Sequence, residues 1–143
     1  MLSPVKSRLQ SGNLISIHHP NVDRVKKALA NETHDWHLLH EMTDPGLTVH
    51  VPGQGPNSGQ WPRDQWLGCL SQLMAPPDEK ITITPTYVAG NDDLVMLFNR
   101  VTARRNGRTH VQLVAETWRF ADGLCVEVWD HFTDEKAWND FWS

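Results

Sequence analysis

Cysteine is scarce in this chain of 143 residues, which contains only Cys69 and Cys125. Two cysteines cannot build the disulfide framework of a small secreted domain, so we expect both thiols to be reduced. No apolar run approaches the roughly 18 residues of a membrane-spanning helix, and no apolar stretch of a secretory signal lies within residues 1–12. The sequence therefore predicts a cytoplasmic protein that makes no contact with a membrane.

Basic residues are also few, because 13 Lys and Arg against 17 Asp and Glu give a net charge of −4. A general nucleic-acid binder would show a basic face, so we expect no nucleic-acid partner. Hydrophobic residues make up 39% of the chain and charged residues 21%, which excludes disorder by composition. The length fits about one domain. We predict a flexible N-terminal arm over residues 1–19 and a single domain over residues 20–143.

Hydrophobic periodicity changes along the chain from a helical to an alternating pattern. Helices are expected over residues 20–29, 35–42, 62–74 and 134–142, and strands over 47–51, 81–88, 94–104, 110–120 and 124–132. Residues 52–59 are rich in Gly and Pro and predict a loop. Asn91-Asp92 and Asn106-Gly107 predict turns, and Asp122-Gly123 predicts a tight hairpin turn. Helices followed by strands indicate an α+β fold. We expect a cone-shaped, curved antiparallel sheet around the N-terminal helices, with a pocket at its mouth.

Several short motifs then occur in a particular order. They are Leu47-Thr-Val-His-Val-Pro-Gly53, Ser58-Gly59, Thr117-Trp-Arg-Phe-Ala-Asp-Gly123, Val126-Glu-Val-Trp-Asp130 and the tail Asp140-Phe-Trp-Ser143. Together they resemble the SnoaL-like, polyketide cyclase-like family of the nuclear transport factor 2 (NTF2) and ketosteroid isomerase-like superfamily, over about residues 20–143. The resemblance implies an α+β barrel with an apolar cavity, usually in a homodimer. Relatives include cyclases, isomerases, dehydratases and epoxide hydrolases, so the fold does not identify the reaction.

Two acidic residues lie on strand faces that are otherwise apolar. Asp130 shares its strand face with Val128 and Phe132. Glu116 shares its face with Val114 on the strand before the turn. Counting back through the turn sets the two acids roughly opposite each other on the concave side, to within one bulge residue. Burial and mutual repulsion would raise the pKa of one of them, which suits a proton shuttle. The alternative is a structural ion pair of one acid with Arg100 or Arg119.

The resemblance adds a role to one of these residues. Asp130 stands where polyketide cyclases of this family carry their acid/base aspartate. The Glu116 position tends to carry a histidine in those cyclases, so this chain departs from their pattern there. A ketosteroid isomerase mechanism is not expected, because Val51 and Val25 stand where that enzyme has its aspartate base and its tyrosine. An epoxide hydrolase arrangement would need Arg100 to point inward between the two acids.

Further residues are predicted to meet the substrate. His50 is either a hydrogen-bond donor in the cavity, acting with the two acids, or a partly exposed strand histidine. Trp61 and Trp66 flank the loop at the expected mouth, where an indole could stack on a planar ligand. The predicted substrate contacts are Trp61, Trp66, Trp118, Tyr87 and Arg100.

A cluster of histidines invites a metal-site interpretation, which we reject. His34, His37, His40 and Glu41 lie opposite the apolar stripe of the predicted helix and are expected to form a solvated face. We therefore expect no metal and no cofactor.

These observations predict a cofactor-independent enzyme that acts on a hydrophobic, oxygenated small molecule of polyketide or terpenoid type. The reaction would be cyclisation, isomerisation or dehydration by acid/base chemistry, with epoxide hydrolysis as a weaker option. The alternative is a non-catalytic binding or assembly module of the same fold. We also expect a homodimer, because one outer strand face is unusually apolar. Its residues are Leu113, Ala115, Cys125, Trp129 and His131.

Overall fold

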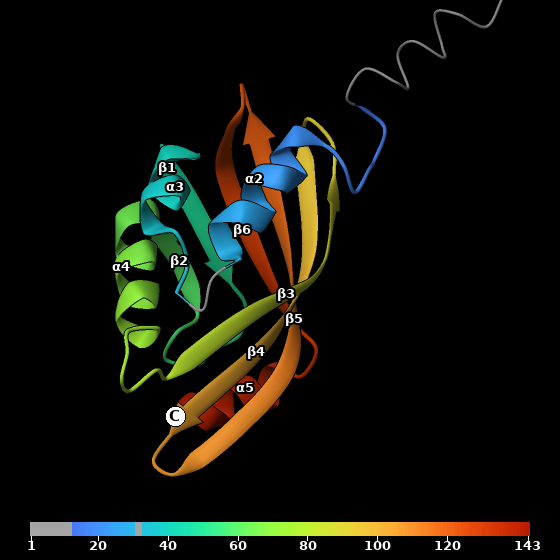
Figure 1. Ribbon diagram of the computed structural model, residues 1–143. Coiled ribbons are helices and arrows are strands. Elements are labelled where there is room, and N and C mark those ends of the chain that lie inside the picture. The colour runs from blue at the N-terminus through green and yellow to red at the C-terminus, as the bar shows by residue number, and fades with distance from the viewer. Residues whose placement is uncertain (1–12, 31–32) are drawn as a thin grey trace, which may run out of the picture.

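A computed structural model describes residues 13–30 and 33–143 of the chain (Figure 1). The elements follow in the order α2 (Pro20–Leu29), α3 (Trp36–Glu41), β1 (Thr43–Val51), β2 (Gly59–Pro62), α4 (Arg63–Leu73), β3 (Ile81–Gly90), β4 (Leu94–Arg105), β5 (Arg108–Ala121), β6 (Leu124–Phe132) and α5 (Glu135–Trp142). The strands form one six-stranded sheet in the order β2-β1-β6-β5-β4-β3. The sheet is curved and open, with β2 and β3 at its edges, and the predicted α+β class is confirmed.

Side chains next to the helices fix where they begin. His19 lies just before α2, and its ring accepts a hydrogen bond from the Asn21 amide in the first turn. Pro20 also occupies this turn, where its missing N–H costs nothing. Asp35 accepts from the Leu38 amide at 3.0 Å and Asp134 accepts from the Ala137 amide at 2.9 Å. These caps satisfy amides that no helical carbonyl can reach.

Two hairpins join the long strands of the sheet. Asn106 and Asp122 have φ values of 52° and 51°, and the glycines that follow them are also at positive φ. Two successive residues at positive φ match the twist of the flanking strands, and Asn-Gly and Asp-Gly supply this conformation at low cost. Both turns therefore form where the sequence predicts them.

The sheet differs from the expectation in two respects. β1 pairs with β6 in parallel, so the sheet is mixed and not wholly antiparallel. β2 forms between the predicted loop and the predicted helix, sharing Gly59 with the loop and Pro62 with the helix. It pairs with β1 from Val51↔Gly59 to Thr48↔Pro62. A proline is tolerated there because β2 is an edge strand.

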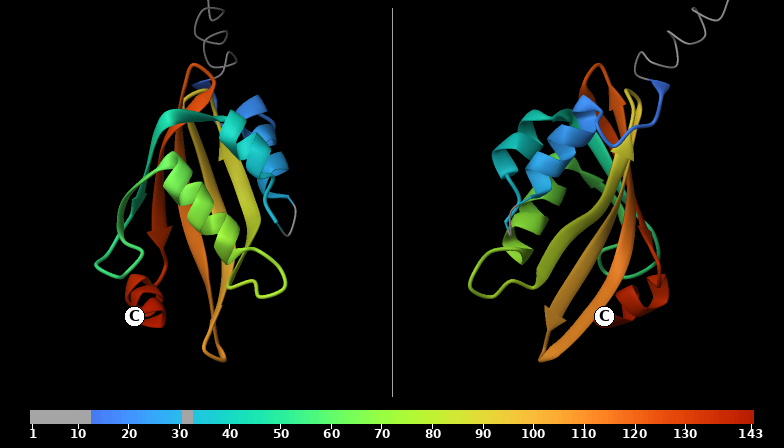
Figure 2. Two further views of the ribbon diagram at one scale, coloured as in Figure 1. Left: turned by 90° about the vertical axis from the view of Figure 1, so that its left-hand side faces the viewer. Right: turned by 45° about the vertical axis from the view of Figure 1, so that its right-hand side comes forward.

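Helices α2, α3 and α4 cover the concave face of the sheet, and no layer of helices from the described residues covers the opposite face (Figure 2). The core between the layers contains Val22, Val25, Leu39, Leu47 and Trp118, each at most 1% exposed. A second apolar cluster lies towards α5, and it includes Met74, Ile81, Val101, Val114 and Phe141. The functional candidates lie between these two clusters.

The start of the chain is only partly described. Residues 1–12 of the predicted arm lie outside the described residues. Ser16 exchanges two backbone hydrogen bonds with Gly90, at 2.9 and 3.0 Å, so this part of the predicted arm is attached to the sheet edge. No helix in the described ranges is long and apolar enough to span a membrane.

Candidate active site

The two acids predicted from strand alternation lie side by side. Glu116 on β5 is the direct register partner of Asp130 on β6. Asn99 on the neighbouring strand β4 donates a hydrogen bond from Nδ2 to Oε1 of Glu116 at 2.7 Å. Three polar side chains from three adjacent strands thus form one row on the concave face.

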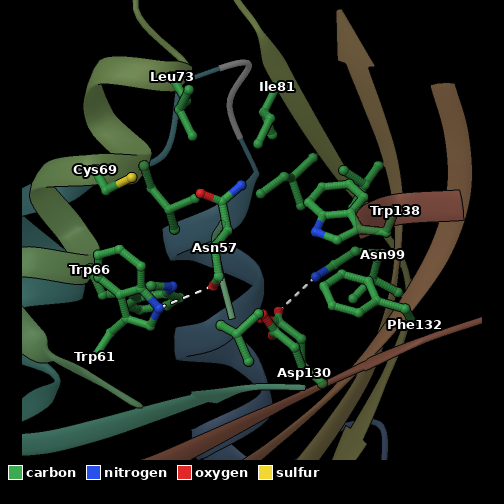
Figure 3. Close-up of a pocket in the computed structure, with 16 residues that line it drawn as sticks. Asn57, Trp61, Trp66, Cys69, Leu73, Ile81, Asn99, Asp130, Phe132 and Trp138 are labelled. Atoms are coloured by element: carbon green, nitrogen blue, oxygen red, sulfur yellow. Dashed lines mark hydrogen bonds between the residues drawn. The ribbon is translucent and has the colours of Figure 1, made fainter. Parts of the chain in front are cut away.

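This row forms one wall of a cavity of about 100 Å³ between α4 and the sheet (Figure 3). The rest of the lining is mostly apolar. It comprises Val51, Asn57, Trp61, Trp66, Cys69, Leu70, Leu73, Ile81, Ile83, Val101, Val114, Phe132 and Trp138. Two carboxyl groups in such surroundings are costly unless they share protons or hydrogen bonds.

Burial has the largest effect on the acid pair. It raises the pKa of Asp130 well above its ordinary value, and the charge of Glu116 and a hydrogen bond to Glu116 raise it further. Burial also raises the pKa of Glu116, but hydrogen bonds from Asp130 and Asn99 oppose that effect. Because Glu116 alone has partners that stabilise its charge, the pair holds its proton on Asp130.

A loop between β1 and β2 closes one side of the cavity. The Trp61 indole donates to the Asn57 carbonyl at 3.1 Å, and the Ser58 hydroxyl donates to the Pro52 carbonyl at 2.9 Å. Gly53, at φ 95°, packs so closely on α5 that a Cβ there would lie 2.4 Å from the Asn139 side chain. These contacts hold the Asn57 side chain against the cavity.

His50 lies outside the cavity, so its predicted catalytic placement is wrong. Its Nε2 is 2.8 Å from Oε2 of Glu127, and its ring stacks on Trp129 at 5.3 Å on the uncovered face. The strand alternation assigned His50 correctly to the face opposite Val49, but that face is the outer one. Arg119 pairs with Glu127 at 2.7 Å and with neither cavity acid, so the predicted alternative of a structural ion pair does not form there.

Three of the predicted substrate contacts also lie elsewhere. Arg100 is exposed because it is next to the inward Asn99 on β4 and therefore points outward. Tyr87 is 75% exposed and contacts Phe98 edge-on across the outer face. Trp118 is 1% exposed in the core and does not line the cavity. Trp61 and Trp66 do line it, as expected.

The histidine cluster is split by the fold. His37 and His40 are exposed, and His37 pairs with Glu41 at 3.0 Å, but His34 is 5% exposed and not on a solvated face. Burial lowers the pKa of His34 to about 4. Within residues 13–30 and 33–143, no three His, Cys, Asp or Glu side chains are arranged to hold a metal ion.

Sequence reasoning missed three polar residues of the cavity. Asn57 comes from a loop, Asn99 from the middle of β4 and Trp138 from α5. A polar residue between Leu97 and Val101 in an alternating strand was the available signal for Asn99. Nothing in the local sequence indicates that α5 folds back to bring Trp138 beside Phe132, with their rings 4.8 Å apart.

Comparisons with known proteins identify the fold. No protein-family model and no curated protein matches the sequence. Among solved structures, Bal32a from a soil-derived mobile gene cassette is 23% identical with a TM-score of 0.77, and the match covers 86% of this chain and 96% of that one. An NTF2-like protein of unknown function from Burkholderia pseudomallei is 17% identical with a TM-score of 0.70, over 86% and 97% of the two chains.

IdmH, a candidate polyketide cyclase from Streptomyces antibioticus, is 22% identical with a TM-score of 0.61. That match covers 80% of this chain and 93% of IdmH. The predicted resemblance to SnoaL-like and NTF2-like proteins is therefore confirmed at the level of the fold, which does not identify a reaction.

Proposed function

We propose that this protein is an enzyme that moves protons on a hydrophobic, oxygenated small molecule of polyketide or terpenoid type. The observation that carries the proposal is the pair of carboxyl groups, Glu116 and Asp130, in a cavity that is otherwise mostly apolar. Proton transfer between a substrate and two carboxyl groups needs no cofactor. Cyclisation, isomerisation and dehydration all add a proton at one substrate atom and remove one at another, so each suits the pair.

Asp130 is the proposed proton donor. Its Oδ1 is buried and has no hydrogen-bond partner in the described protein, and the residue lines the cavity. Protonated Asp130 would give its proton to a substrate oxygen, and the resulting carboxylate would take a proton back from substrate carbon or water. Glu116, held by Asn99 at 2.7 Å, positions Asp130 and keeps its pKa high.

Two other functions have less support. Epoxide hydrolysis by two acids and an arginine lacks its arginine, since Arg100 is exposed and no arginine of residues 13–30 or 33–143 lines the cavity. A purely binding module would have no need for two buried carboxyls, which cost stability without contributing apolar contact. An enzyme explains both acids.

The test uses enolisable ketones, with acetophenone as the first probe, and measures exchange of their α-hydrogens for deuterium in D₂O by NMR. Asp130→Asn preserves shape and removes the acid, so exchange should fall by about 100- to 10,000-fold. Asp78→Asn on the exposed surface is the matched control and should not change the rate. Equal exchange by the wild type and Asp130→Asn would refute the role of Asp130.

The proposal includes a cytoplasmic homodimer that associates through the uncovered face of the sheet. Met96, Phe98, Val111 and Leu113 on this face are each between 43% and 51% exposed, which makes an apolar patch. One residue predicted for this surface, Cys125, is instead fully buried. A bulge shifts the register between Arg119 and Phe120 and turns Cys125 to the inside.

A further inference from the structure

Several polar atoms that face this cavity have no hydrogen-bond partner within the described chain. They are Oδ1 of Asn99, Oδ1 of Asp130 and Nε1 of Trp138, all buried, and all three residues line the cavity. Buried polar atoms in folded proteins are almost always paired, since an unpaired one loses its hydrogen bond to water and gains nothing. Three of the six buried, unpaired side-chain polar atoms in the described chain thus belong to residues of this one cavity, and they indicate the hydrogen bonds that a ligand would make.

Trp138 supplies a donor whose position is fixed. Its ring stacks on Phe132 at 4.8 Å with an interplanar angle of 18°, and it contacts Trp142 at 5.7 Å. The residue is 7% exposed, and Figure 3 shows its nitrogen on the side of the ring towards the cavity. An indole N–H only donates, so the ligand must present an acceptor.

Asn99 supplies an acceptor. Its Nδ2 is engaged with Glu116 at 2.7 Å, and the side chain is 2% exposed. The amide oxygen has no partner in the described chain, and a carbonyl oxygen only accepts. The ligand must present a donor to it.

The charge and size of the cavity restrict the ligand further. Among the residues that the structure describes, no Lys or Arg lines the cavity, and Glu116 would repel an anion, so a carboxylate or phosphate does not fit. The volume of about 100 Å³ is of the same order as the roughly 150 Å³ cavity that holds benzene. The buried end of the ligand is thus about one ring in size, and any larger part extends through the mouth.

We infer that the ligand is a neutral ring compound whose buried end carries both a carbonyl oxygen for the Trp138 indole N–H and a hydroxyl for the Asn99 carbonyl. Hydroxy ketones and the enols of dicarbonyl compounds have this pattern. The inference rests on the proposed function only in taking the same cavity as the site. It assigns Trp138 and Asn99 as specificity residues, which the acid/base proposal does not require.

The carbonyl contact is tested with acetophenone and α-methylstyrene, which share a shape but differ in having C=O or C=CH₂. Dissociation constants are measured for the wild type, Trp138→Phe and Trp142→Phe. Trp142 is the matched control because its Nε1 is also buried and unpaired on the same helix but does not line the cavity. Comparing the ratio of the two constants between variants cancels the difference in hydration of the two probes.

Loss of one neutral hydrogen bond should reduce the preference for acetophenone by about two- to tenfold in Trp138→Phe and leave it unchanged in Trp142→Phe. The indole N–H signal that disappears from the ¹H–¹⁵N spectrum of Trp138→Phe should move downfield in the wild type with acetophenone and not with α-methylstyrene. An unchanged ratio in Trp138→Phe would overturn the assignment. If Trp138→Phe does not fold, the Trp138 signal is assigned in the wild type by nuclear Overhauser effects to the Phe132 ring, and this readout still decides the question.

The hydroxyl contact is tested in the wild type with 3′- and 4′-hydroxyacetophenone against their fluoro analogues, because fluorine cannot donate. At least one hydroxyl isomer should bind more tightly than its analogue, and equal binding of both pairs would overturn the role of Asn99. Benzoate should bind more weakly than acetophenone, and tighter binding of benzylamine would overturn the neutral-ligand assignment.

These outcomes separate the inference from the proposed function, because they measure binding and not turnover. In Asp130→Asn the acetophenone preference should persist while deuterium exchange is lost. If deuterium exchange depends on Asp130 but the preference for acetophenone over α-methylstyrene is the same in the wild type and Trp138→Phe, the inference alone is rejected. A clear preference with exchange that is independent of Asp130 would reject the proposed function alone.

Discussion

Replacing Asp130 with asparagine should remove a pH dependence from the stability of the folded protein. Burial and Glu116 raise the pKa of Asp130 well above its ordinary value, so the folded protein retains a proton that the unfolded chain releases. Asparagine has nearly the same shape and its amide can still donate to Glu116, but it does not titrate. The substitution therefore isolates the proton from the packing.

The sign and size follow from proton linkage. An unfolded aspartate has a pKa of about 3.9, so above about pH 4 the unfolded state binds fewer protons than the folded state. Stability from Asp130 is then complete below that pH and is lost as the pH rises towards the folded pKa. One retained proton corresponds to a loss of about 1.4 kcal/mol in the free energy of unfolding per pH unit.

The measurement is urea unfolding of the wild type and Asp130→Asn at pH 5, 6 and 7. The stability of Asp130→Asn relative to the wild type should increase by about 1.4 kcal/mol per pH unit for as long as the folded wild type keeps the proton. Asp78→Asn, which alters an exposed acid, should follow the wild type at every pH. Parallel curves for the wild type and Asp130→Asn would show that Asp130 is ionised in the fold and would refute the reasoning.

Three further predictions concern other parts of the molecule. Burial lowers the pKa of His34 to about 4 from 6.5, so about 3 kcal/mol of stability should be lost as the pH falls through that range, and His34→Gln should flatten this loss in acid-unfolding curves. Leu113→Glu should convert the proposed dimer to a monomer of 16.3 kDa by light scattering, whereas a wild type already at that mass would contradict the dimer. Cys69 lines the cavity whereas burial raises the pKa of the Cys125 thiol to about 12, so a thiol reagent should modify one cysteine in the folded protein and two after unfolding, and acetophenone should slow the first reaction.

Strand alternation predicted the central feature of the site. Each strand side chain alternates between two faces, and the Asp122-Gly123 turn fixes the pairing of the two strands. The alternation therefore places Glu116 and Asp130 on apolar strand faces and roughly opposite each other. Counting back from the turn alone would pair Glu116 with Trp129, and the bulge between Arg119 and Phe120 brings Asp130 into register with Glu116. The same rule failed at Cys125, because a bulge in the register reverses the face of every residue beyond it.

Alternation alone does not determine which face of a sheet is covered. His50 was assigned to the correct side of β1 relative to Val49, but the helices pack on the other side. Arg100 was left undetermined for the same reason, and β4 turns it outward because Asn99 points in. Which face is interior depends on where α2, α3 and α4 pack, and that involves contacts between residues far apart in sequence.

The sequence by itself determined the α+β class, the positions of the two hairpin turns and the apolar strand faces that carry Glu116 and Asp130, because each depends on local periodicity or on glycine at positive φ. Only the tertiary structure decided what surrounds that pair. The parallel pairing of β1 with β6 joins distant segments, as does the packing of Trp138 and Phe141 of α5 in one cluster with Met74 and Val101. Such contacts are selected by burial of apolar surface over the whole chain, which leaves little trace in local sequence.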